Sequence, residues 1–297
     1  MRLLRAATLS VADVDRSEAL YRDWLDYKTV ERGALPVEIA RALDAPTSAG
    51  RKYVVMQPAS GAEIFLRFVE NDPHPDYRPL RTYGWQAVEI CVQDVLAVNE
   101  RMLKSPFEII GPPRELDGLP AIFPMQVKGP DQEIVYLTQI RDDLPAYDLP
   151  RAQSLIDKLF ILVLACSDLK GSLNFARDML GLEFGRDMAI VYTMLANAFG
   201  VPHERKFTIA TVIHERDVFL EFDQMPPWAT ARPGHAGALP QGVACATLLT
   251  PDFDARMGVL EEWLITPPAK RDGPLYAGKR SAALRGPDGT LYELLEA

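Results

Sequence analysis

The chain has 297 residues, which is enough for about two domains of ordinary size. Its formal net charge of −9 argues against a nucleic-acid-binding protein, because the lysines and arginines are not concentrated into a basic patch. No apolar run approaches the roughly 18 residues that span a bilayer, so no membrane partner is expected.

The first elements are predicted at residues 6–27, AATLSVADVDRSEALYRDWLDY. An alternating apolar run ends at Asp13, and apolar residues then recur at helical spacing, which predicts a strand followed by a helix. Asp15 and Glu18 are spaced as in a capping box at the start of this helix. Two strand-like runs, 51–58 and 62–69, follow and complete a unit of strand, helix and several strands.

The same unit returns three times along the chain. Residues 161–182 match residues 6–27 without a gap, at an offset of 155, and the segments 84–95 and 242–253 match each other. The pattern therefore predicts modules at about 1–70, 83–140, 155–225 and 240–297. The stretch 141–153, RDDLPAYDLPRAQ, is charged and rich in proline, and we expect it to link two halves at 1–142 and 155–297.

A Gly-Pro-Asp turn precedes the last strand of the second and fourth modules. The first copy reads GPDQEIVYLTQI at 129–140 and the second reads GPDGTLYELLEA at 286–297. Tyr136 in the first copy stands where the second has Glu293, and Gln132 stands where the second has Gly289. If this turn position is left-handed, Gln132 carries strain of about 1 kcal/mol that glycine avoids.

The three cysteines, Cys91, Cys166 and Cys245, are scattered, and each lies in an apolar run. An odd number of dispersed cysteines does not suit a disulfide framework. We expect buried free thiols in a reducing compartment, and therefore a cytoplasmic protein.

The fourfold pattern resembles the vicinal oxygen chelate superfamily, whose members include glyoxalase I, bleomycin-resistance proteins and the extradiol dioxygenases. The resemblance covers nearly the whole chain. It implies an α+β fold in which four βαβββ modules form two tandem paired-βαβββ (glyoxalase-like) domains, each curled around a cavity. Whether the modules pair in chain order or exchange partners between the halves is left open.

In that superfamily a divalent metal is typically held by a histidine on the opening strand of each module and a glutamate on the last strand. The corresponding positions are Ala6, Arg67, Ala87 and Tyr136 in the first half and Ile161, Glu221, Cys245 and Glu293 in the second. No histidine occupies any of them. The resemblance thus implies a metal-free first half and no cofactor, with a divalent metal at Glu221 and Glu293 left open as an alternative.

Glu293 and Glu221 are the predicted catalytic residues. Each is an acid on a strand expected to face a cavity, where burial would raise its pKa and let it act as a general acid or base. Two carboxylates in one cavity would also titrate separately. The structural alternative for Glu293 is an ion pair with an arginine, for example Arg285.

Four further residues are predicted to bind the substrate: Cys245, Arg67, Tyr136 and Glu89. Arg67 suits a substrate carboxylate or phenolate, although neutralising Glu89 is the alternative. Tyr136 either donates a hydrogen bond to a substrate oxygen or packs in the core. Cys245 has no evident electropositive neighbour, which favours a buried thiol over a nucleophile.

These residues favour a metal-independent lyase or isomerase that acts by acid–base chemistry on a small, partly apolar carbonyl or aromatic compound. One alternative is a non-catalytic protein that binds or sequesters a small molecule. A second is a divalent-metal enzyme of the glyoxalase or dioxygenase type that uses Glu221 and Glu293. The expected partner is a small-molecule ligand, and a homodimer is left open.

Overall fold

The computed structural model describes residues 1–116 and 118–297, with the backbone alone at Arg186. Each of the four predicted modules is present. The first contains β1 (Leu4–Val11), α1 (Val14–Leu25), β2 (Tyr27–Ala34), β3 (Lys52–Pro58) and β4 (Phe65–Glu70), with α2 (Val37–Ala42) and the 3₁₀ turn η1 (Pro46–Ser48) between β2 and β3. The second contains β5 (Gly84–Val92), α3 (Val95–Met102), β6 (Glu108–Gly111), β7 (Ile122–Lys128) and β8 (Ile134–Ile140).

The later two modules repeat this order. The third contains β9 (Ile156–Cys166), α4 (Leu169–Asp178), β10 (Glu183–Val191), β11 (Lys206–His214) and β12 (Asp217–Gln224), with α5 (Thr193–Phe199) inserted after β10. The fourth contains β13 (Gly242–Thr250), α6 (Phe253–Val259), η2 (Glu261–Trp263), β14 (Ala269–Lys270), β15 (Arg280–Arg285), η3 (Pro287–Gly289) and β16 (Leu291–Glu296).

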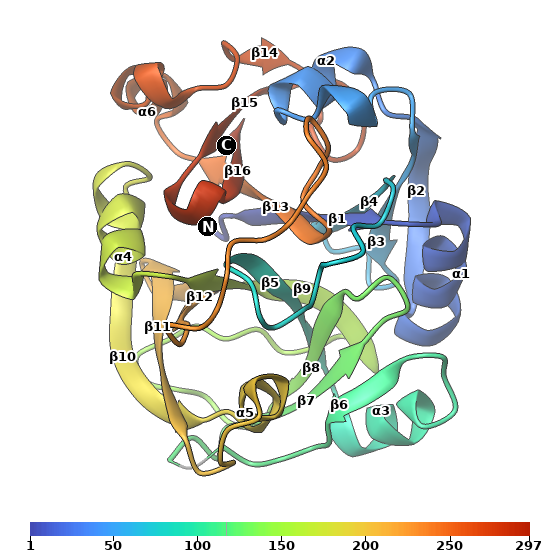
Figure 1. Ribbon diagram of the computed structural model, residues 1–297, viewed down its shortest axis with the longest axis vertical. Helices are drawn as coiled ribbons and strands as arrows, with labels where there is room; N and C mark the ends of the chain where they lie inside the picture. Colours follow the sequence, from blue (N-terminus) through green and yellow to red (C-terminus); the bar gives the residue numbers. More distant parts are fainter. Residues whose placement is uncertain (117) are drawn as a thin grey trace.

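The modules pair between the halves of the chain and not in chain order. One eight-stranded sheet has the order β14-β15-β16-β13-β1-β4-β3-β2, and the other has the order β10-β11-β12-β9-β5-β8-β7-β6 (Figure 1). The opening strands make the junctions, because β1 pairs antiparallel with β13 and β5 pairs antiparallel with β9. We call the sheet of the first and fourth modules the outer sheet and that of the second and third the inner sheet. The predicted halves, 1–142 and 155–297, each contribute one module to each sheet.

The Gly-Pro-Asp turns connect the modules in the other direction. Asp131 accepts hydrogen bonds from Ala12 N and Ser17 Oγ, both at 3.0 Å, so the turn of the second module docks on the helix start of the first. Asp288 accepts hydrogen bonds from Ser167 N at 2.8 Å and Ser167 Oγ at 2.6 Å, which docks the fourth module on the third. The sheets therefore join the two halves, and the turns join the modules within each half.

The first helix begins two residues earlier than the expected capping box would place it. Asp13 is the N-cap, and its side chain accepts from Arg16 N. The expected box of Asp15 and Glu18 is wrong, because Glu18 instead accepts hydrogen bonds from Thr29 and Arg32 on the neighbouring strand.

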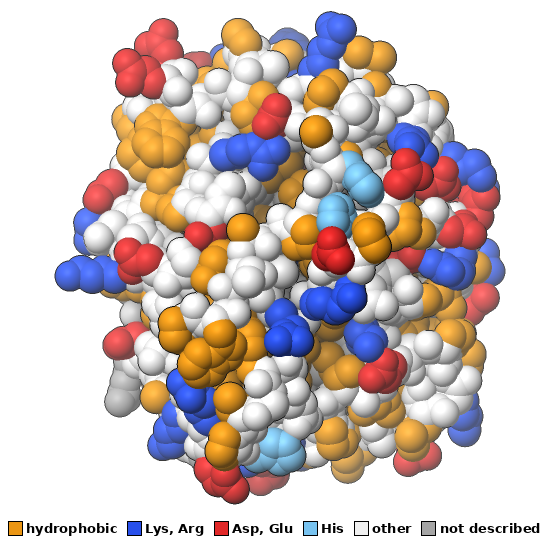
Figure 2. Space-filling view, viewed as in Figure 1, with side chains coloured by type: hydrophobic (Ala, Val, Ile, Leu, Met, Phe, Trp, Pro, Cys, Tyr) orange, Lys and Arg blue, Asp and Glu red, His pale blue; other side chains and the backbone are white. Residues whose placement is uncertain are grey.

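One continuous core takes apolar residues from both sheets and from α1, α3, α4 and α6, and a separate cluster fills the remaining face of each sheet. The three cysteines are free and buried, as expected. Within residues 1–116 and 118–297, no helix is both long and apolar enough to cross a membrane. On the face drawn in Figure 2, acidic and basic side chains are interspersed, in keeping with the absence of a basic stripe in the sequence.

Candidate functional site

Polar side chains gather on the inward face of each sheet, where the register shows which positions are neighbours. Arg67 on β4 lies beside Thr8 on β1, and Glu293 on β16 lies beside Thr247 on β13. In the inner sheet, Tyr136 lies beside Glu89, and Glu221 lies beside Val163. The resemblance points to Ala6, Ala87, Ile161 and Cys245 on the opening strands. In each case the residue that actually pairs with the last-strand position lies two residues later in the sequence, on the same face of the opening strand.

In the outer sheet, Arg67 and Glu293 form a buried ion pair. Arg67 Nη2 lies 3.2 Å from Glu293 Oε2, and each side chain is only 1% exposed. Tyr276 accepts from Arg67 at 2.5 Å and donates to Glu293 Oε1 at 2.9 Å, while Thr247 donates to Glu293 Oε2 at 2.9 Å. Every charge of this network has an internal partner, so Glu293 is held as a structural anion.

Two sequence predictions are corrected by this network. Glu293 and Glu221 do not share a cavity, because the fourth module pairs with the first and the third pairs with the second. The arginine that neutralises Glu293 is Arg67 and not Arg285, whose guanidinium donates to Asp44 at 2.8 Å. Cys245 lies in the outer sheet with Glu293, and burial raises the pKa of its thiol well above the ordinary value.

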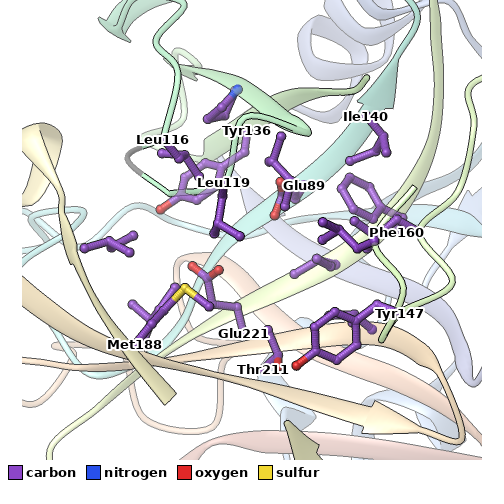
Figure 3. Close-up of a pocket in the computed structure, with 18 of the residues that line it drawn as sticks. Glu89, Leu116, Leu119, Tyr136, Ile140, Tyr147, Phe160, Met188, Thr211 and Glu221 are labelled. Atoms are coloured by element: carbon purple, nitrogen blue, oxygen red, sulfur yellow. The ribbon is translucent and has the colours of Figure 1, made fainter. Parts of the chain in front are cut away.

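The inner sheet encloses a cavity of about 100 Å³. Its ionisable and hydroxyl groups include Glu89 on β5, Tyr136 on β8, Glu221 on β12 and Tyr192 just before α5. Gln126, Tyr147 and Thr211 also line it. Most of its wall is apolar, formed by leucine, isoleucine, valine, proline, methionine and phenylalanine side chains. Figure 3 shows the carboxyl groups of Glu89 and Glu221 turned toward each other, with Tyr136 on one side and Phe160 and Tyr147 on the other.

Segments whose amino-acid sequence is not repeated between the modules help to close this cavity. Leu144, Tyr147 and Leu149 come from the stretch 141–153, which the sequence predicts only as a linker. Leu116 and Leu119 come from the loop between β6 and β7, and Met188 comes from β10. Sequence reasoning missed Tyr192, Met188 and the linker residues. Met188 on β10 and Tyr192 before α5 have structural counterparts in β2 and α2 of the first module, but the amino-acid sequence does not repeat there, and the linker lies outside the modules.

Burial sets the protonation of the two cavity carboxyls. Glu89 is 7% exposed, and burial raises its pKa to about 8, with a further contribution from the charge of Glu221. Burial also raises the pKa of Glu221, to about 7, against the opposing effect of its hydrogen bond with Tyr192. Near neutral pH this pair therefore holds about one proton, which suits one acid and one base.

A third carboxyl and two hydroxyls extend the pair. Asp223 is fully buried, and its burial and the charge of Glu221 raise its pKa well above the ordinary value. Neither of its carboxyl oxygens has a hydrogen-bond partner among the described residues. The Tyr192 hydroxyl lies 3.2 Å from Glu221 Oε1 and 2.9 Å from the Tyr136 hydroxyl. These contacts hold Glu221 in place and put a hydroxyl donor beside it.

The donor set of neither sheet fits the divalent metal that the resemblance implies. In the outer sheet the carboxylate of Glu293 already forms an ion pair with the guanidinium of Arg67, which would repel a metal cation. In the inner sheet Val163 stands beside Glu221. Among the residues that the structure describes, no group of three or more histidine, cysteine, aspartate or glutamate side chains is arranged to hold a metal ion. The expected alternative of a metal at Glu221 and Glu293 is wrong because those residues lie in different sheets.

No protein-family model matches the sequence, and no curated protein matches it. Solved structures match over nearly the whole chain. Glyoxalase I from Zea mays matches with a TM-score of 0.64 at 18% identity, covering 99% of this chain and 92% of that one. The cppA protein from Streptococcus pneumoniae matches with a TM-score of 0.51 at 9% identity, covering 100% of this chain and 98% of that one. The chain thus has the glyoxalase I fold, the α+β arrangement of four modules expected from its resemblance to the vicinal oxygen chelate superfamily.

Proposed function

We propose that the protein is a metal-independent isomerase or lyase that moves a proton within a small, largely apolar carbonyl compound bound in the inner-sheet cavity. The observation that carries the proposal is the pair of carboxyls, Glu89 and Glu221, which face each other inside an apolar wall. Their raised pKa values leave one protonated and one ionised near neutral pH.

The reaction begins with ionised Glu221 as the general base. It removes a proton from the carbon next to the carbonyl, and the C–H electron pair becomes the C=C bond of an enol. Protonated Glu89 donates its proton to the carbonyl oxygen in the same step, so the charge moves from one carboxyl to the other. Transfer of the Glu221 proton to another carbon, with return of the enol hydroxyl proton to Glu89, gives the isomer and restores both groups. In a lyase reaction the enol instead breaks the bond to a group on the neighbouring carbon, which leaves with the proton from Glu221 while Glu89 takes back the hydroxyl proton.

The surroundings of the pair favour this chemistry. The leucine and isoleucine wall excludes water, which strengthens the electrostatic interaction of each carboxyl with a reacting atom. Tyr192 keeps Glu221 oriented through a hydrogen bond of 3.2 Å. The cavity is of a size suited to a single small ring or a short chain.

Binding without turnover is the second candidate function. The predominance of apolar wall over polar groups favours it, since such a wall holds a small molecule without any chemistry. The metal-dependent alternative has no support from the donor set of either sheet.

Deuterium exchange separates the first two candidates. Butanone and phenylacetone are incubated with the protein in D₂O, and loss of the proton next to the carbonyl is followed by NMR. We expect exchange with the wild type, loss of at least about 100-fold in Glu221→Gln, and no change in the control Glu262→Gln, whose glutamate is exposed and remote from the cavity. Ligand-induced stabilisation without exchange would favour the binding protein.

A further inference from the structure

We propose that the ligand of the inner-sheet cavity is a small organic cation, an ammonium group on an apolar body, and that the carboxyls of Glu89 and Glu221 bind its charged end. This inference rests on the proposed function only in placing the substrate in this cavity. The charge, the aromatic wall and a comparison of the two sheets each support it.

The charge of the cavity favours a cation. Glu89 and Glu221 line it, and Asp223 is fully buried beside Glu221. In the described part of the chain, the lining residues include no lysine or arginine. A buried carboxylate is costly unless it is paired, so a cation that enters is stabilised while an anion is repelled.

Equivalent positions in the two sheets hold side chains of opposite charge. Arg67 in IFLRF and Glu221 in VFLEF are the equivalent residues of the first and third modules. In the outer sheet that position supplies a guanidinium 3.2 Å from Glu293, and the pair is closed to ligand. In the inner sheet the same position supplies another acid. The outer sheet therefore carries its own cation, and the inner sheet takes its cation from a ligand.

The aromatic residues of the cavity suit the same ligand. Phe160, Tyr136, Tyr147 and Tyr192 all line it, and the rings of Tyr136 and Tyr192 meet edge to face with centroids 6.3 Å apart. The faces of aromatic rings attract cations, most strongly where water is excluded. The aliphatic remainder of the wall requires that the rest of the ligand be apolar.

Three ligands of matched shape test the inference: benzylamine, benzyl alcohol and benzoate, measured by titration calorimetry. We expect benzylamine to bind at least about tenfold more tightly than benzyl alcohol, and benzoate to bind more weakly than either. In Glu89→Gln and Glu221→Gln the preference for the amine over the alcohol falls to within about twofold. Binding of the alcohol by the same variants verifies that they are folded, and Glu262→Gln is the matched control.

Proton release gives a second readout. Near pH 6.5 the amine should displace protons from the carboxyl pair, so its binding enthalpy changes between buffers of different ionisation enthalpy, whereas that of the alcohol does not. Equal affinities for the amine and the alcohol, tighter binding of benzoate, or binding of none of the three would overturn the inference.

The outcome also separates the inference from the proposed function. Selective amine binding without exchange in any carbonyl probe leaves a cation-binding protein, and the proposed enzyme fails. Exchange that is lost in Glu221→Gln, together with no preference for the amine, leaves the enzyme and removes the cation.

Discussion

Two glutamates that look alike in sequence have opposite surroundings. Glu293 accepts hydrogen bonds from a guanidinium and three hydroxyls, whereas Glu221 faces a second carboxyl across an apolar space. Both were expected to be catalytic from their place on a strand. The difference arises from the partner module, because pairing decides which side chains each acid meets.

The outer-sheet pair should matter for stability and not for ligand binding. Glu293→Gln leaves the buried guanidinium of Arg67 without its counter-charge, so we expect the free energy of unfolding to fall by about 3 kcal/mol or more. Urea denaturation measures this, and benzylamine binding to the inner sheet should stay unchanged at temperatures where the variant is folded. A loss of stability no larger than that of Glu262→Gln, or a loss of ligand binding, would contradict the assignment.

The inner-sheet pair should make stability fall as the pH rises. Glu89 has a folded-state pKa raised to about 8, above its unfolded value near 4.3, so the folded state keeps a proton that the unfolded state has released. Its contribution is fully present below about pH 4 and is lost as the pH rises to about 8. In Glu89→Gln this loss is absent.

Urea titrations at pH 5 and pH 8 check this sign. The stability of Glu89→Gln relative to the wild type should increase between the two by about 3.5 kcal/mol. A difference that is the same at both pH values would show that Glu89 is not the titrating group.

At the scale of single elements, the repeated turn before the last strand tests the prediction that Gln132 has a left-handed backbone conformation. This residue has φ = 69°, as does Gly289 in the equivalent turn, so the expected left-handed conformation is confirmed. Gly289 has open space where a Cβ would lie, so its replacement tests the backbone conformation alone.

A reciprocal pair of variants measures the cost of that conformation. We expect Gln132→Gly to raise the free energy of unfolding by about 0.5 kcal/mol, because relief of the left-handed strain exceeds the greater entropy of the unfolded glycine. Gly289→Gln should lower it by about 1 kcal/mol. Changes of the same sign in both variants would contradict this account.

Much of the element pattern could be predicted from the sequence, because each module carries its own strand alternation and turn, and Asp13, Asp94 and Asp168 cap the first helix of the first three modules. The pairing of modules could not, since alternation specifies which face of a strand is buried and not which strand lies beside it. The residues of the cavity could be predicted from the sequence only in part. Glu89, Tyr136 and Glu221 lie on strands whose sequence pattern repeats. Tyr192 lies just before α5, where the sequence does not match that around α2 in the first module, and Tyr147 lies in the linker.

At the scale of the whole molecule, the sheets join the two halves of the chain and the Gly-Pro-Asp turns join the modules within each half. This arrangement predicts how fragments of the chain behave. In a chain cut after residue 153, the fragments 1–153 and 154–297 each hold one module of each sheet, and the first keeps the linker residues that line the cavity. We expect neither fragment to be a folded monomer and the mixture to assemble one-to-one, as measured by light scattering and circular dichroism. Benzylamine should bind only the mixture, because Glu89 and Glu221 come from different fragments. A stable, monomeric 1–153 fragment would contradict the interlocked arrangement.

The same pairing sets an order of events during synthesis. The inner sheet uses only residues between β5 and β12, so it can be complete while the fourth module is still unmade. Strand β1, buried along its whole length in the finished protein, must wait for β13 before its outer edge is covered. An unpaired apolar edge invites pairing with other chains. The nascent protein therefore completes its cavity while the apolar edge of β1 is still unpaired. We expect chaperones to be needed most between the synthesis of β12 and that of β13.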